Sequence, residues 1–333
     1  IFSRSSCNFV FPEDQQFFRP MPGSQLDKIT EDQLDNLSNK EMLSHADGVY
    51  DESDVNEKTN AQIKYKKEIE SAFQLFEEKA YNFFESDLPK YVKQTDEVLS
   101  SIQPAFKNNL QKYSPKMHKI LENLLDDTNA GLHLLYSHFR NLGGIGIFVK
   151  ILDYYGFTQF KIKQGQGKMG EKIWELDLEH PYYQKDQFLS QNRKFYALYT
   201  GKESNEEKEI IRNVFNGNFK EIPSLLREQI FNEFQDKMNV NGLEIDQSQL
   251  ITNRFGQIIK LLIISASGAE GIDLKNVRFV HIMEPYWHPV RISQVIGRAR
   301  RICSHTDLPD EFKNVKIFMY LLSYDQEQMK IKI

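Results

Sequence analysis

The sequence predicts an α/β fold, in which a parallel β-sheet carries helices on both faces and a helical segment precedes the sheet. From residue 131 onward, short apolar runs that suit strands alternate with helical periods. Several of these runs are continuously apolar, as expected for strands that are covered on both faces. The segments that join them are mostly short and polar. These three observations indicate strand–helix–strand units arranged in one sheet.

Residues 1–60 are predicted to form a segment without a core of its own. Residues 7–22, CNFVFPEDQQFFRPMP, are rich in aromatics and prolines and suit a short strand that leads into a tethered loop. Residues 23–60 hold ten acidic residues against three lysines and few aromatics. Such a composition buries too little apolar surface to offset the entropy lost on ordering. We expect a flexible, solvated linker that is dispensable for folding.

A helical segment is predicted over residues 61–130. Ala61–Phe84 carries an apolar stripe at helical spacing, formed by Ile69, Phe73, Phe76, Ala80 and Phe83. We interpret the stripe as core, because a base-stacking platform needs exposed ring faces. Ser114 and Pro115 suit the N-cap and first turn of a second helix. The buried side of that helix is expected to consist of Met117, Ile120, Leu121, Leu124 and Leu125.

The α/β region is predicted to span residues 131–333. Strands are expected at residues 131–139, 157–163, 195–200, 261–266, 278–283 and 315–322. Helices are expected from residue 141 through 155, at 206–215 with Ser204 or Asn205 as N-cap, at 224–238, and from Pro289 onward. The polar stretches near residues 165–192 and 217–258 are interpreted as insertions.

Three stretches look like nucleotide-binding motifs but lack the spacing or the residues that those motifs require. Residues 141–146 are rich in glycine, but the spacing is wrong for a dinucleotide fingerprint. Residues 165–172 have the glycine separation of a P-loop, yet Glu171 stands where the lysine is required and Lys172 where a hydroxyl must hold magnesium. Residues 124–127, LLDD, resemble the end of a Walker B strand but follow helical spacing.

The helix that begins at Pro289 divides into an apolar and a cationic face. Its apolar face is predicted to comprise Ile292, Val295, Ile296, Ala299 and Ile302. The other face is predicted to comprise Arg291, Gln294, Arg298 and Arg301. No acidic residue lies between the first and last of these arginines, so their repulsion is not relieved within the helix. Because guanidinium groups match phosphate oxygens, we expect an anionic partner.

The sequence of this region resembles that of a known family. Residues 294–301, QVIGRARR, resemble the Q-x-x-G-R-x-x-R element, motif VI, of superfamily-two helicases, and residues 267–274 resemble their motif V. Residues 131–139 are similar to motif IV. The link EPYWHPVRISQ is similar to that of the Swi/Snf-like, DEAD-like helicases of large nucleocytoplasmic DNA viruses. The resemblance implies a RecA-like second motor lobe from about Gly131 onward, with the CNFVFP segment lying between the two lobes.

The resemblance also implies site residues at the carboxyl ends of the strands. Arg298 and Arg301 are expected to act as arginine fingers toward the nucleotide phosphates, with Gln294 nearby and Gly297 allowing close approach. Gly271 and Asp273 are expected to couple the nucleotide to the nucleic-acid track, whose residues would be Ser137, His138, Ser265, Ser267 and Gly268. Asp273 could instead be a turn residue, and the two arginines a surface ion-pair helix. Glu284, Trp287 and His288 could serve only the core or local hydrogen bonds.

The implied cofactor is ATP with Mg, held mainly by a first lobe that these 333 residues do not contain, because no Walker A lysine or Walker B box is present. We therefore expect a fragment of a longer chain. The expected partners are a nucleic acid, with DNA favoured over RNA, the first lobe, and the transcription machinery. The net charge of −5 restricts phosphate contacts to local patches. The alternative is a non-catalytic scaffold lobe that binds a transcription partner.

Composition also bears on the compartment in which the protein is expected. Only two cysteines, Cys7 and Cys303, are present, and neither they nor the eight histidines form a metal-ligand cluster. No apolar run is long enough to span a membrane. We expect a reduced intracellular protein without zinc, in the host cytoplasm or the virion if it is viral.

Overall fold

The computed structural model describes residues 8–10, 64–65, 67–72, 74, 110–140, 143–167, 170–178, 194–201, 203–238, 252–266, 271–285 and 289–323. The chain forms two compact units, one comprising Ile1–Lys119 with Phe139–Lys150 and the other comprising Ile120–His138 with Ile151–Ile333. The predicted linker at residues 23–60 and most of the predicted helix at 61–84 lie outside the described residues. The domain boundaries predicted near residues 60 and 130 stay predictions. In the described part of the chain, no helix is both long and apolar enough to cross a membrane.

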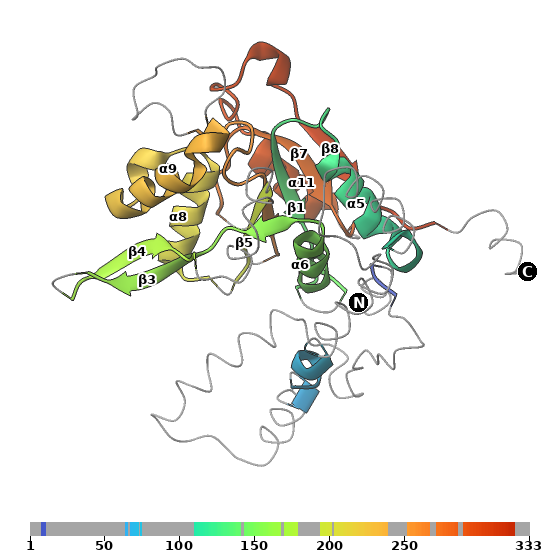
Figure 1. Ribbon diagram of the computed structural model, residues 1–333. Helices are drawn as coiled ribbons and strands as arrows, with labels where there is room; N and C mark the ends of the chain where they lie inside the picture. Colours follow the sequence, from blue (N-terminus) through green and yellow to red (C-terminus); the bar gives the residue numbers. More distant parts are fainter. Residues whose placement is uncertain are drawn as a thin grey trace, which may run out of the picture. The chain divides into compact units, whose positions relative to one another are not determined.

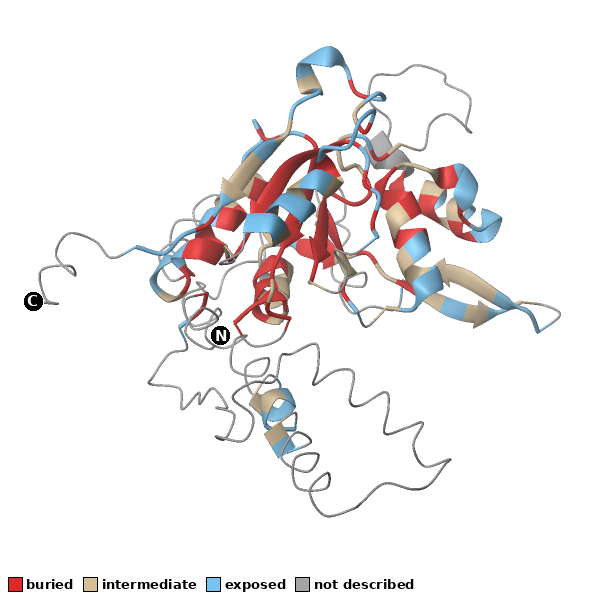
Figure 2. Cartoon of the chain, turned by 180° about the vertical axis from the view of Figure 1, so that it is seen from behind, coloured by how far each residue is buried: buried red, intermediate tan, exposed pale blue. Residues whose placement is uncertain are grey.

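Six parallel strands form the main sheet, in the order β2-β5-β6-β1-β7-β8 (Figure 1). Their bounds are β1 Leu132–Tyr136, β2 Phe157–Gln159, β5 Lys194–Tyr199, β6 Leu261–Ile264, β7 Val277–Ile282 and β8 Lys316–Met319. Every residue of β1, β6 and β7 is buried, so the continuous apolar runs are explained by coverage on both faces (Figure 2). The predicted α/β fold with a parallel sheet is confirmed.

One face of the sheet is covered by α8 Asn205–Phe215, α9 Ser224–Met238 and α11 Pro289–Ala299. Alternate residues of the central strands, including Leu134, Leu262 and Val280, share one hydrophobic core with apolar residues of these three helices. The ring of Phe195 in β5 meets that of Phe234 in α9 with centroids 4.9 Å apart. The three helices lie where the sequence predicts helices.

The opposite face is covered by α5 Pro115–Leu125 and α6 Ile145–Tyr154. Tyr196, whose neighbours in β5 point into the core of the first face, donates to Asp153 Oδ1 of α6 at 2.8 Å. Tyr320, which follows β8, accepts from Asn123 Nδ2 of α5 at 2.8 Å. Helices therefore lie on both faces of the sheet, as predicted.

The predicted strand at residues 157–163 and the insertion that follows it need correction. The chain leaves the sheet after β2, and residues 162–166 form β3, which pairs in antiparallel fashion with β4 Lys172–Leu176. This hairpin extends away from the sheet beside α9 (Figure 1). Gln229 of α9 accepts from the backbone N–H of Leu176 at 2.8 Å and so fastens the base of the hairpin. The P-loop imitation thus begins in β3 and ends in β4, and it is followed by a strand and not by a helix.

Capping side chains begin two of the helices where the sequence predicts them. Ser114 Oγ accepts from Met117 N at the start of α5 at 3.2 Å, and Ser204 Oγ accepts from Glu207 N at the start of α8 at 3.2 Å. Ser204, and not Asn205, is therefore the N-cap of α8. The acidic residues in the first turn of that helix complement its dipole.

Asn8 ties together three parts of the unit that contains residues 139–150. Its Nδ2 donates to the carbonyl of Gly143 at 2.7 Å, its Oδ1 accepts from Lys116 Nζ at 3.1 Å, and its backbone carbonyl accepts from Ser114 Oγ. Asn8 is fully buried. The CNFVFP segment is thus anchored at this residue to the starts of α5 and α6.

Two glycines offer a matched test of packing. A Cβ at Gly144, just before α6, would overlap the carbonyl oxygen of Phe139, whereas a Cβ at Gly297 in α11 would meet nothing within 4 Å. Gly144→Ala is expected to destabilise the protein by about 2–4 kcal/mol, because backbone must shift to make room. Gly297→Ala is expected to stabilise it by about 0.5–1 kcal/mol, because alanine lowers the entropy cost of the helix.

Chemical denaturation of both variants and the wild type would measure these changes. Equal midpoints for Gly144→Ala and wild type would show that the turn before α6 can relax without cost.

Candidate nucleotide and nucleic-acid site

The candidate site lies beyond the carboxyl ends of β1, β6 and β7. These strands finish in register, because Tyr136 pairs with Ile264 on one side and with Ile282 on the other. The segments that follow the three strands, beginning at Ser137, Ser265 and Met283, therefore start at one edge of the sheet. Loops at this edge are the usual place for ligands of open parallel sheets.

Two of these segments are joined by a buried carboxylate. Glu284 is 2% exposed; its Oε1 accepts from Ser137 Oγ at 2.9 Å and its Oε2 accepts from His138 N at 2.9 Å. Both carboxylate oxygens thus hold the turn after β1. Glu284 is a positioning residue for this turn, a role that its sequence context left open.

The predicted nucleic-acid residues differ in burial, and two of them lie outside the described residues. Ser137 and Ser265 are fully buried, and Ser137 is held by Glu284, so a direct contact of either hydroxyl with a nucleic acid does not fit this arrangement. That expectation is corrected for these two serines. His138 is half-buried. Ser267 and Gly268, like Trp287 and His288, lie outside the described residues.

The loop of motif V presents Asp273 to solvent. Gly271 has φ +72°, a left-handed conformation that favours glycine. After it, Ile272 and Leu274 are buried whereas Asp273 and Lys275 are exposed, so the loop alternates between core and surface. The two apolar side chains anchor the loop, and the carboxylate between them is directed outward.

Helix α11 presents the polar residues of motif VI. Val295 and Ala299 are buried and Ile292 and Ile296 pack on the same core, which confirms four residues of the predicted apolar face. Gln294 and Gly297 are exposed and Arg298 is half-buried. Ile302, predicted on the apolar face, is 96% exposed, because the helix ends at Ala299.

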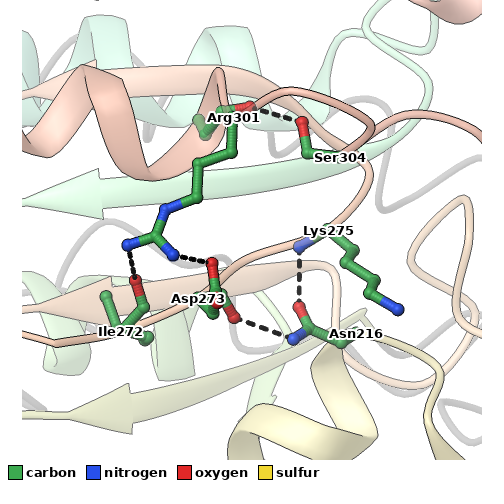
Figure 3. Close-up of polar contacts among 7 residues, drawn as sticks. Asn216, Ile272, Asp273, Lys275, Arg301 and Ser304 are labelled. Atoms are coloured by element: carbon green, nitrogen blue, oxygen red, sulfur yellow. Dashed lines mark hydrogen bonds and ion pairs between the residues drawn. The ribbon is translucent and has the colours of Figure 1, made fainter.

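Arg301 is placed differently from the prediction. It follows the helix, and its guanidinium pairs with the carboxylate of Asp273 and donates from Nη2 to the carbonyl of Ile272 at 3.4 Å (Figure 3). The acidic partner absent from the helix is thus supplied by the motif V loop. With side chains 38% and 62% exposed, such a pair adds at most about 1 kcal/mol to stability. Its role is to orient the two groups.

A second set of contacts holds the chain around this pair, and the sequence did not single it out. Asn216, at the C-cap of α8, donates from Nδ2 to the carbonyl of Asp273 and accepts at Oδ1 from Lys275 N, both at 2.8 Å (Figure 3). On the other side, Ser304 donates its N–H to the carbonyl of Arg301 at 3.1 Å. The Asn216-Gly217 pair marks a helix end in sequence, but no local signal shows its distant partner.

The described part of the site can recognise an anion. Among the described residues, no three His, Cys, Asp or Glu side chains form a group that could hold a metal ion. For Arg298, no hydrogen bond or ion pair is found within the described part of the chain. The exposed Gln294 and Gly297 beside it leave room for a phosphate group. Chemically, the surface offers donors and fixed positive charge.

Comparison with known proteins identifies the region. Residues 224–303 match the helicase conserved C-terminal domain. A protein of Acanthamoeba polyphaga mimivirus described as ATP-dependent RNA helicase R563 is 29% identical over 244 residues, covering 73% of this chain and 31% of the relative. The termination factor NPH-I homolog of African swine fever virus (isolate Tick/Malawi/Lil 20-1/1983) is 29% identical over 250 residues, covering 71% and 30%.

A further mimivirus relative, described as ATP-dependent RNA helicase R350, is 27% identical and matches 96% of this chain but 33% of its own length. The chain thus spans about a third of the curated relatives it matches. Among solved structures, the C-terminal part of the Fun30 ATPase domain is 15% identical with a TM-score of 0.35, covering 93% of this chain and 84% of that one. The Pyrococcus furiosus Hef helicase domain is 13% identical with a TM-score of 0.30, covering 97% and 56%.

Proposed function

Because this chain is the C-terminal portion of a superfamily-two helicase with a RecA-like fold, related to helicases of large DNA viruses, we propose that it forms the second motor lobe of a nucleic-acid-dependent ATPase. In this role Arg298 and Arg301 serve as arginine fingers. The motor acts as a helicase or translocase in transcription or other DNA transactions.

One observation carries the proposal. Arg298 lies on an exposed polar face of α11 with Gln294 and Gly297, and Arg301 follows just after the helix and pairs with Asp273 of the motif V loop. The end of α11 thus carries both guanidinium groups, and a loop distant in sequence supplies the carboxylate that orients one of them. Planar, permanently charged forks stabilise the charge that develops on a transferring phosphoryl group.

The residues present fit one wall of a site for ATP with Mg. Arg298 and Arg301 would face the phosphates, Gln294 would lie near them, and Gly297 would let a phosphate approach the helix closely. ATP supplies the phosphoryl group that is transferred to water. The backbone cradle, the lysine and the magnesium ligands of a P-loop are missing from these 333 residues, so a first lobe would hold most of the cofactor.

The nucleic-acid track is proposed to run along the same sheet edge, over His138, Ser267 and Gly268. Gly271 and Asp273 would connect it to the nucleotide. We favour DNA over RNA on the likeness of residues 284–294 to Swi/Snf-like helicases, although two of the relatives are described as RNA helicases. The relative described as a termination factor makes the transcription machinery a candidate partner.

An ATPase assay tests the proposal. The full-length protein is expected to hydrolyse ATP faster when DNA is added, and RNA of the same sequence is the comparison. The 333-residue chain alone is expected to show no turnover at saturating DNA, because nothing in it positions the γ-phosphate. Robust turnover by this chain alone would contradict the two-lobe assignment. A full-length protein that does not hydrolyse ATP would favour the scaffold alternative.

A further inference from the structure

Asn216, at the end of α8, makes two hydrogen bonds to the backbone of the motif V loop. Asn216 is 7% exposed and closes α8, well outside the motifs that carry Asp273 and Arg301. Its amide makes two bonds, one to the carbonyl of Asp273 and one from the N–H of Lys275. A single side chain therefore pairs with the loop backbone on both sides of Leu274, much as a neighbouring strand would.

These bonds bear directly on the orientation of the Asp273 carboxylate. The peptide group before Asp273 is held through the Ile272 carbonyl, which accepts from Arg301 at 3.4 Å. The peptide group after it is held through the Asp273 carbonyl, which accepts from Asn216 at 2.8 Å. With both flanking peptide groups bonded, rotation of the backbone at Asp273 is restricted, and its carboxylate stays directed at Arg301 (Figure 3).

We infer that Asn216 is a positioning residue, which acts through the motif V loop to hold Asp273 and thereby Arg301 in place for phosphoryl transfer. The inference rests on the proposed finger role of Arg301. The side-chain hydrogen bonds of Asn216 go to the loop backbone and not to the guanidinium. Loss of its two bonds would let the loop between Ile272 and Lys275 shift, and misplacement of a reacting group by about 1 Å costs on the order of a hundredfold in rate.

The test uses the full-length protein and the variant Asn216→Ala. Nucleic-acid-stimulated kcat is expected to fall by about tenfold or more, with little change in the KM for ATP, because ground-state binding is not what Asn216 supports. Hydrogen exchange at the amide of Lys275 is expected to accelerate. Asn216→Asp, which keeps an acceptor for that amide but cannot donate to the Asp273 carbonyl, is expected to lower kcat as well.

Two controls separate positioning from stability. Val214→Ala opens a cavity in the same helix at a fully buried residue whose apolar side chain cannot hydrogen-bond to the loop, and is expected to lower the unfolding midpoint while kcat stays within twofold of wild type. In an Asp273→Ala background, Asn216→Ala is expected to cause no further loss of kcat, because the residue acts through Asp273.

The outcomes distinguish this inference from the proposed function. If Arg301→Ala lowers turnover strongly but Asn216→Ala leaves it within twofold of wild type, the positioning role is wrong and the finger role stands. The positioning role is equally wrong if Val214→Ala lowers kcat as much as Asn216→Ala does. If Arg301→Ala itself has normal turnover, the finger role fails, and the inference about Asn216 falls with it.

Discussion

Replacing Arg298 or Arg301 by alanine in the full-length protein is expected to reduce nucleic-acid-stimulated ATP turnover about a thousandfold or more, the range for an arginine finger. Binding of ATP should change little, because a finger acts on charge that develops in the transition state. Steady-state turnover together with binding of a fluorescent ATP analogue would measure both quantities.

The structure distinguishes the two arginines. Arg301 is held by Asp273 and the Ile272 carbonyl, whereas no partner of Arg298 is found among the described residues. Asp273→Ala is therefore expected to impair turnover mainly through Arg301 and to add little to Arg301→Ala, while adding fully to Arg298→Ala. Lysine should not rescue either position, because a point charge cannot reproduce the planar guanidinium fork.

Arg300 provides the matched control. It lies between the two arginines, just past the last residue of α11, and its side chain is exposed. Arg300→Ala is expected to keep turnover within a few-fold of wild type. Near-normal turnover of Arg298→Ala or Arg301→Ala would assign that arginine to the solvated surface or to a nucleic-acid contact instead.

Acidification below about pH 6.5 is expected to destabilise this chain through two buried histidines, which lie on the face of the sheet that α5 and α6 cover. His133 in β1 and His281 in β7 are fully buried, with His133 Nδ1 and His281 Nε2 2.9 Å apart. The carbonyl of Asn129 can only accept, so neutral His133 donates to it from Nε2 at 3.1 Å and accepts at Nδ1 from His281 Nε2–H. His281 Nδ1 then accepts from the hydroxyl of Tyr320 at 2.7 Å, and that hydroxyl accepts from Asn123 Nδ2.

This chain of hydrogen bonds requires both imidazole rings to be neutral, because each ring donates one hydrogen bond and accepts one. Burial lowers the pKa of His281 from 6.5 to about 3, and burial followed by repulsion from His281 lowers the pKa of His133 well below its usual value. Both histidines therefore bind protons more readily in the unfolded chain than in the folded one. Their contribution to stability is complete above about pH 6.5 and is lost progressively as the pH falls toward 3.

The free energy of unfolding is expected to fall by about 3 kcal/mol between pH 7 and pH 4 from His281 alone. Urea unfolding at several pH values would measure this change. His281→Gln should lower stability at pH 7 but flatten its dependence on pH, because the titrating ring is gone. Tyr320→Phe removes a hydrogen bond and keeps both histidines, so it should retain the steep dependence. An unchanged slope in His281→Gln would show that other groups cause the acid sensitivity.

Much of the fold could be predicted because its signals are local. The continuous apolar runs of β1, β6 and β7 reflect burial on both faces, and the period of α11 separates Val295 and Ala299 from Gln294 and Arg298. The sequence did not show that β3 belongs to a different sheet from β2. Both are short extended segments, and the residue pattern does not change where the chain leaves the main sheet and enters the β3–β4 hairpin.

The sequence by itself determined the order of the main-sheet strands and the helices between them, the motifs and the arginine-bearing helix, because residue spacing and backbone preference act over a few neighbouring residues. Only the tertiary structure decided which groups meet. Arg301 finds Asp273 across 28 residues, Asn216 finds the same loop across 57, and His133 finds His281 across 148. A polar side chain could form hydrogen bonds with many chemically equivalent partners in the chain. The packing of the sheet and its helices decides which partner lies within reach.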